Sequence, residues 1–261
     1  MTEDQAWHRI AVLGDSIAVH RGDPVDGYPT RTWAERLVLA LAPDEYRNFG
    51  VSGARAAQIR AGQLAPALTF RPDLAILAAG ANDAARRSFR PDLVEPDLAG
   101  MIGALSRSGA LVVTLGCFDL SRTLGAETAG RLRDLGRLTE RLSHRHGGLH
   151  IDFSEHPEQR DGVLGADGLH INARGHAVVA ATLLTALKPG HGLRDRVGNG
   201  DVGGQHRAVD QHHREAERAG GGRLGVGAAA VLADQGVAPP LAQERGQAVG
   251  PAEGGHPGVT S

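Results

Sequence analysis

Ser16, Asp167 and His170 are residue types from which proteins build an activated nucleophile. Ser16 stands in the sequence HRIAVLGDSIAVH, directly after the apolar run of residues 10–13. Asp167 and His170 are three residues apart in DGLH, a spacing that lets both side chains point into one pocket from a turn. A serine hydroxyl attacks an acyl carbon when a histidine takes its proton and a carboxylate orients that histidine. We expect these three residues to have these roles.

Two further sequences supply hydrogen-bond donors for the negative charge that develops on the attacked carbonyl. Gly53 lies in NFGVSGA and Asn82 in GAND. The backbone N–H groups of Ser16 and Gly53 and the side-chain amide of Asn82 could converge on such an oxyanion. Glycine at position 53 also permits close approach of the backbone to a substrate.

Each of these motifs has a plainer interpretation when it is taken alone. Ser16 could be only a helix N-cap, and Gly53 could only complete a turn. Asn82 could cap a helix or form an Asx-turn, and Asp167 could simply stabilise the turn that His170 closes. Their joint occurrence after successive apolar runs favours a common site over four unrelated turns.

The pattern of apolar runs predicts a single α/β domain. Strands are expected at residues 10–13, 46–51, 74–79, 110–115 and 149–152, and helices from 30 or 32 to 41, and at 54–68, 92–107, 129–146 and 172–187. The run at 74–79 is unbroken rather than alternating, which is typical of a central parallel strand covered on both faces. Ligands bind beyond the carboxyl ends of such strands, where all four motifs are expected.

GDSI at 14–17, Gly53 in its block, GAND at 80–83 and DGLH at 167–170 together resemble the ordered blocks of the SGNH hydrolases, also called GDSL esterases or lipases. The resemblance covers roughly residues 8–187. It implies a flavodoxin-like three-layer α/β/α fold with a five-stranded parallel sheet, and hydrolysis of acyl esters without a metal or cofactor. Arg55 departs from the small hydroxyl residue that many members have there.

By position, the resemblance implies a catalytic triad of Ser16, Asp167 and His170. It also implies an oxyanion hole formed by Ser16, Gly53 and Asn82. The expected partner is a small-molecule acyl ester, and a short-chain ester, a lysophospholipid and an O-acetylated metabolite all stay open. Segments 17–29 and 119–128 are expected to wall the pocket. The alternative function is a catalytically silent binding or scaffold protein, whereas a nucleotide binder would need a phosphate-binding loop that the sequence lacks.

Composition excludes several other classes of protein. The net charge of −2 over 261 residues gives no electrostatic signature of nucleic-acid binding, and no apolar run is long enough for membrane insertion. The single cysteine, Cys117, fits a reducing compartment, and no secretory signal is visible, so we expect a cytoplasmic protein. The histidines at 144, 146 and 150 lack carboxylates in a metal-binding register. The oligomeric state is left open.

The last part of the chain differs from the rest. Residues 190–261 hold 17 glycines in 72 positions and no aromatic residue. Such a segment has too little apolar surface to offset its ordering entropy. We therefore expect a hydrolase domain at 1–189 followed by a disordered, non-catalytic tail.

Overall fold

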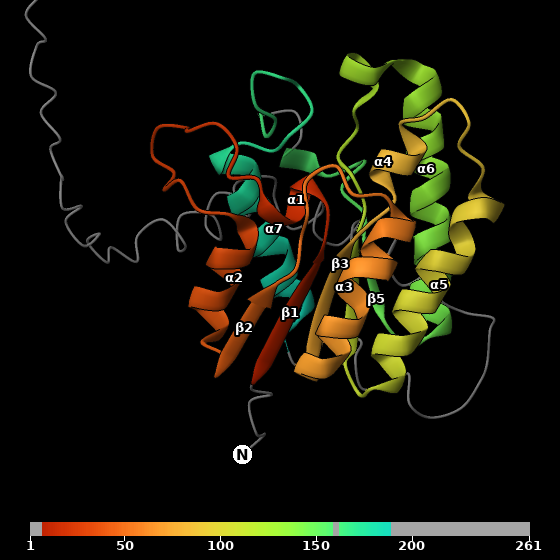
Figure 1. Ribbon diagram of the computed structural model, residues 1–261. Helices are drawn as coiled ribbons and strands as arrows, with labels where there is room; N and C mark the ends of the chain where they lie inside the picture. Colours follow the sequence, from red (N-terminus) through yellow and green to blue (C-terminus); the bar gives the residue numbers. More distant parts are fainter. Residues whose placement is uncertain (1–6, 159–161, 189–261) are drawn as a thin grey trace, which may run out of the picture.

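The computed structural model describes residues 7–158 and 162–188. In this part of the chain, five parallel strands form one sheet in the order β2-β1-β3-β4-β5 (Figure 1). The strands are β1 (Arg9–Gly14), β2 (Glu45–Asn48), β3 (Leu74–Ala78), β4 (Leu111–Leu115) and β5 (Leu149–Ile151). The helices are α1 (Ser16–Val19), α2 (Trp33–Leu41), α3 (Ala56–Phe70), α4 (Ala81–Ala84), α5 (Pro91–Arg107), α6 (Ser121–Arg145) and α7 (Ala173–Ala186). The predicted α/β class and five-stranded parallel sheet are confirmed.

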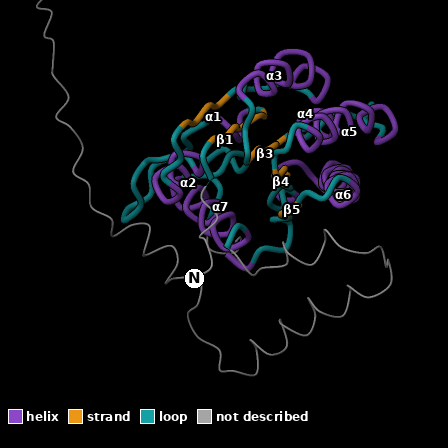
Figure 2. Tube along the Cα trace, turned by 90° about the horizontal axis from the view of Figure 1, so that it is seen from below, coloured by secondary structure: helices purple, strands orange, loops and turns teal. Residues whose placement is uncertain are grey.

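Helices cover both faces of this sheet and make three layers. Figure 2 shows α2 and α7 on one side of the strands and α3, α5 and α6 on the other. Ile10 and Val12 of β1 pack into the core on the α2 and α7 side, whereas Ala11 and Leu13 pack into the core on the opposite side. Since neither face of β1 meets water, its sequence is continuously apolar rather than alternating.

Most element boundaries differ from the sequence prediction by one or two residues, and two differ by more. The second strand ends at Asn48 rather than at residue 51, although Phe49 and Val51 still donate backbone hydrogen bonds to β1. Helix α6 begins at Ser121 rather than at residue 129, and it is interrupted at Gly125, where φ is 77°. That left-handed residue breaks the helical pattern in the sequence, so only the part after it was recognisable as a helix.

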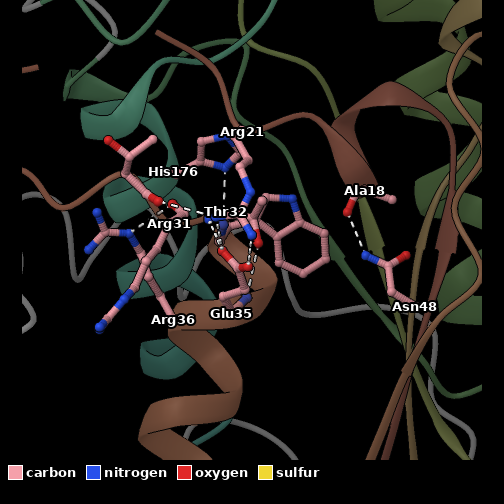
Figure 3. A network of polar contacts seen from close by, with 10 residues as sticks. Ala18, Arg21, Arg31, Thr32, Glu35, Arg36, Asn48 and His176 are labelled. Carbon is pink, nitrogen blue, oxygen red and sulfur yellow. Dashed lines mark hydrogen bonds and ion pairs between the residues drawn. The ribbon is translucent and has the colours of Figure 1, made fainter. Parts of the chain in front are cut away.

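Polar contacts around the start of α2 fix the short helix α1 that follows β1. Thr32 caps α2 and forms a reciprocal capping box with Glu35. The Trp33 indole donates to the carbonyl of Ile17 at 2.8 Å, and the Asn48 amide donates to the carbonyl of Ala18 at 2.7 Å. Figure 3 shows the cap formed by Thr32 and Glu35 and, apart from it, the contact between Asn48 and Ala18. The first turn after β1 is thus held from both α2 and β2.

Three sequence predictions are not settled by this fold. The tail predicted for residues 190–261 lies outside the described residues, and so does the end of the predicted domain at residue 189. No helix among residues 7–158 and 162–188 is both long and apolar enough to cross a membrane. The cytoplasmic location stays a prediction.

Candidate active site

Ser16 is the first residue of α1, immediately after the carboxyl end of β1. The N-cap of this helix is Asp15, whose carboxylate accepts a hydrogen bond from the backbone N–H of Ile17 at 3.1 Å. The interpretation of Ser16 as a simple N-cap is therefore wrong. Because Asp15 does the capping, the Ser16 hydroxyl can contact groups outside its own helix.

The structure brings Ser16 together with His170 and Asp167. The Ser16 hydroxyl lies 3.0 Å from Nε2 of His170, and Nδ1 of the same ring lies 2.7 Å from Asp167 Oδ2. The hydrogen bond from His170 lowers the pKa of Asp167 to about 2, helped by backbone N–H groups. Asp167 is therefore ionised at neutral pH and can only accept. Nδ1 then carries the ring proton, and Nε2 is left to accept the proton of Ser16.

Hydrogen bonds within the DGLH turn explain how Asp167 is placed. Its Oδ1 accepts from the backbone N–H groups of Leu169 and His170, at 2.9 and 3.0 Å, while Oδ2 is left for the imidazole. Gly168 has φ of 63°, which gives the turn its tight reversal. Thr123 of α6 donates its hydroxyl to the Gly168 carbonyl at 2.7 Å. The spacing of three residues seen in the sequence is thus the spacing of an Asx-type turn.

The segment after α1 holds the same turn from the other side. The Asp23 carboxylate accepts from the N–H of Ala166 at 2.7 Å, and the Asp23 carbonyl accepts from the N–H of Ala173. Between α1 and Asp23, the ring of His20 stacks on the ring of His170, with centroids 4.6 Å apart and planes inclined by 20°. Sequence reasoning missed this contact, because nothing local in the chain signals a pairing between residues so far apart.

The other two predicted oxyanion donors, Gly53 and Asn82, lie in segments that follow β2 and β3. Gly53 sits in the turn before α3 with φ of 75°, and Asn82 lies in α4 beyond the end of β3. Ser16, Gly53 and Asn82 all line one cavity of about 310 Å³. Both hydrogens of the Asn82 amide are engaged, one with Asp15 Oδ2 at 3.0 Å and the other with the Ala54 carbonyl at 3.1 Å.

Comparison with known proteins adds an independent observation to this geometry. The GDSL-like Lipase/Acylhydrolase family matches residues 12–178, which is more than half of the chain. The chain belongs to this family. The resemblance to SGNH hydrolases is confirmed, and the protein is a carboxylic ester hydrolase. A search of curated proteins finds no match for it.

Solved structures share the fold of this GDSL-like hydrolase. TesA is 24% identical, with a TM-score of 0.58, and the match covers 70% of this chain and 99% of TesA. A lipase/acylhydrolase from Enterococcus faecalis is 20% identical, with a TM-score of 0.57 and coverage of 68% and 94%. A catalytic mutant of Axe2, an acetylxylan esterase from Geobacillus stearothermophilus, is 17% identical, with a TM-score of 0.56 and coverage of 68% and 93%.

Asp15 is an unexpected charged group in the hydrolase site. Its side chain is buried, with 2% exposure, and burial raises its pKa to about 6 despite the hydrogen bonds from Ile17 and Asn82. The sequence motif by itself indicates no partner for this carboxylate. The structure adds a contact with the amide that was expected to bind the oxyanion.

Other reactive side chains near the site do not form a second centre. Burial raises the pKa of the Cys117 thiol to about 12, so it is protonated at neutral pH and is a poor nucleophile. Within residues 7–158 and 162–188, no group of three or more histidine, cysteine, aspartate or glutamate side chains could hold a metal ion. His150 instead contacts Thr114 at 2.8 Å within the sheet.

Proposed function

We propose that this hydrolase cleaves acyl esters through a covalent intermediate on Ser16. The observation that carries the proposal is the continuous line of hydrogen-bonded groups from the Ser16 hydroxyl through His170 to the ionised Asp167. A side chain that serves only a turn would not need partners from a loop 154 residues away. The partner is a small-molecule ester, and these roles need neither a metal nor a cofactor.

In the first half of the reaction, His170 Nε2 takes the proton of Ser16 as Oγ bonds to the acyl carbon. The carbonyl oxygen becomes an oxyanion, for which the N–H groups of Ser16 and Gly53 and the Asn82 amide are the proposed donors. The tetrahedral intermediate collapses when His170 returns the proton to the leaving alcohol. Asp167 stabilises the imidazolium that forms between these two transfers.

In the second half, water releases the acyl group. His170 accepts a proton from water as its oxygen attacks the acyl-Ser16 ester, and then returns the proton to Ser16 Oγ. The products are the free acid and the regenerated hydroxyl, so every proton that His170 takes is given back. The enzyme therefore ends in the state in which it began.

The position of Asn82 requires one exchange of hydrogen bonds during this cycle. Its amide has two hydrogens, and both are donated to protein acceptors in the structure. To bind an oxyanion, Asn82 has to share or release its bond to Asp15 or to Ala54. In this respect Asn82 differs from the proposed backbone donors, the N–H groups of Ser16 and Gly53.

Labelling with a fluorophosphonate tests the proposal against the silent scaffold. We expect a covalent adduct on Ser16 in the full-length chain, found by mass spectrometry of the digested protein, and no adduct at this position in Ser16→Ala. A chain that is folded by circular dichroism but stays unlabelled would favour the scaffold. An adduct on another serine would overturn the assignment of the nucleophile.

A further inference from the structure

The cavity beside Ser16 extends well past the reacting groups. It begins at Ser16 and Asn82, passes the ends of β3 and β4, and reaches α6. A water molecule occupies about 30 Å³ of liquid, and a methylene group needs a similar volume, so 310 Å³ holds about ten non-hydrogen atoms. An acetyl group would leave most of this space empty.

The walls of the extension are apolar. The residues that line it between the sheet and α6 include Ala78, Ala79, Leu115, Leu132 and Leu135. Burying an apolar chain against such walls is favourable by about a factor of four in affinity per methylene. Thr139 and His150 are polar members of these walls, and Nε2 of His150 is buried without a hydrogen-bond partner. A sugar or headgroup would therefore find few partners there for the hydration that it loses. The chemistry of the walls therefore fits the acyl side of an ester.

Gly136 is the residue that keeps this extension open. It lies in the interior of α6, where glycine is less favourable than alanine, so helix formation alone does not explain it. A side-chain carbon at this position would meet no heavy atom within 4 Å beyond the adjoining helix backbone. Gly136 lines this cavity and the neighbouring one, so a larger side chain there would occupy space where the two adjoin.

A second cavity adjoins the first and limits the length of the chain. The two cavities share six lining residues, Leu132 and Gly136 among them, but only the second is also lined by Arg133, Glu140 and Asp152. These charged groups would have to lose water to accommodate further methylenes, which is costly. The apolar passage therefore ends close to Gly136.

We propose that the acyl group of the substrate is an unbranched chain of about eight carbons, and that Gly136 determines this length by leaving its distal end open. Eight carbons and two ester oxygens account for the roughly ten atoms that the cavity holds. The inference rests on the proposed role of Ser16, since the chain is placed by its bond to that hydroxyl. Gly136 thus acts on specificity without touching the reacting atoms.

Chain-length profiles test this assignment. We would measure kcat/KM for p-nitrophenyl acetate, butyrate, hexanoate, octanoate and dodecanoate with the full-length wild type, Gly136→Leu and Gly62→Leu. Gly62 is a matched control, because it is an exposed glycine inside α3 with no heavy atom within 4 Å of an added side-chain carbon. We expect the wild type to prefer octanoate to acetate at least tenfold and to lose rate with dodecanoate.

The two leucine variants should then differ in their chain-length profiles. In Gly136→Leu, the ratio of octanoate to acetate activity should fall at least tenfold, and the best substrate should become shorter. Gly62→Leu should keep the wild-type profile. Gly136→Ala guards against a folding defect, since it should retain the wild-type melting temperature and shorten the preferred chain by about one or two carbons.

Three outcomes would overturn the inference: a wild type that prefers acetate, a wild type that hydrolyses dodecanoate as well as octanoate, or a Gly136→Leu profile equal to that of Gly62→Leu. Failure of the proposed function gives a different result. In that case Ser16→Ala would hydrolyse the esters at the wild-type rate, whatever the chain-length profile.

Discussion

The two sides of the Ser16 hydroxyl are built differently. On one side, His170 and Asp167 are already aligned with Ser16 at 3.0 and 2.7 Å, and the turn that carries them is tied to α6 and to the segment after α1. On the other side, Asn82 donates both amide hydrogens to protein acceptors. The groups proposed to transfer the proton are aligned before substrate binds, whereas Asn82, the proposed side-chain donor to the oxyanion, is hydrogen-bonded to a buried carboxylate.

The proposed reaction can use His170 and Asp167 as they stand, whereas Asn82 has to exchange a hydrogen bond first. Preorganised donors stabilise a transition state without reorganisation, and Asn82 does not meet this condition fully. The proposed backbone donors, the N–H groups of Ser16 and Gly53, do not have this limit. Variants on the two sides of Ser16 should therefore affect the enzyme to different extents.

The largest effect is expected on the proton-transfer side. Ser16→Ala removes the attacking oxygen, so kcat for p-nitrophenyl butyrate should fall by about 10⁴-fold or more. Steady-state kinetics with freshly purified protein would measure it, and a melting curve equal to that of the wild type would show that the fold is intact. Activity within tenfold of the wild type would contradict a nucleophilic role.

On the opposite side, Asn82→Ala should lower kcat by about 10²- to 10³-fold if its amide binds the oxyanion. The loss should be in kcat rather than in KM, because the interaction strengthens only when the oxyanion forms. The same kinetic assay measures it. An unchanged rate would instead restrict the oxyanion hole to the N–H groups of Ser16 and Gly53.

Asp15→Asn examines the carboxylate that holds Asn82. The pKa of Asp15 rises from its ordinary value of 3.8 to about 6 in the fold. At pH values between these two, Asp15 is mostly protonated in the folded protein and mostly ionised in the unfolded chain. Acidification from pH 7 to pH 4 should therefore stabilise the wild type relative to Asp15→Asn, by on the order of 2–3 kcal/mol. Urea unfolding at several pH values measures this difference. Parallel stability curves for the two proteins would refute it.

The smallest effect is expected from His20, which stacks on His170. Stacked rings contribute about 0.5–1.5 kcal/mol, so His20→Ala should reduce kcat by about two- to tenfold with little change in KM. His20→Phe retains a flat ring and should recover most of that loss in the same assay. Equal kcat values for the alanine and phenylalanine variants would show that the stack does not position His170.

Much of the fold could be predicted because helix caps and apolar runs are recognisable within a few consecutive residues. Helices were expected to start at residue 30 or 32 and at residue 172, and Thr32 and Asn172 cap the helices that follow them. The start of α6 was missed because Gly125 interrupts its pattern with a left-handed residue. The N-cap of α1 is Asp15 rather than Ser16. Both residue types cap helices, so only the fold shows which of the two does so.

The sequence by itself determined the order of the elements and the identity of the candidate site residues. Apolar runs that end in Gly-Asp-Ser and Gly-Ala-Asn-Asp, and the Asp-Gly-Leu-His sequence in the loop beyond the last strand, place chemistry at one edge of a parallel sheet. Only the tertiary structure decided which donors meet which acceptors: His20 against His170, Asp15 against Asn82, and the open space at Gly136. These contacts join segments far apart in the chain, and their distances depend on packing that no local pattern records.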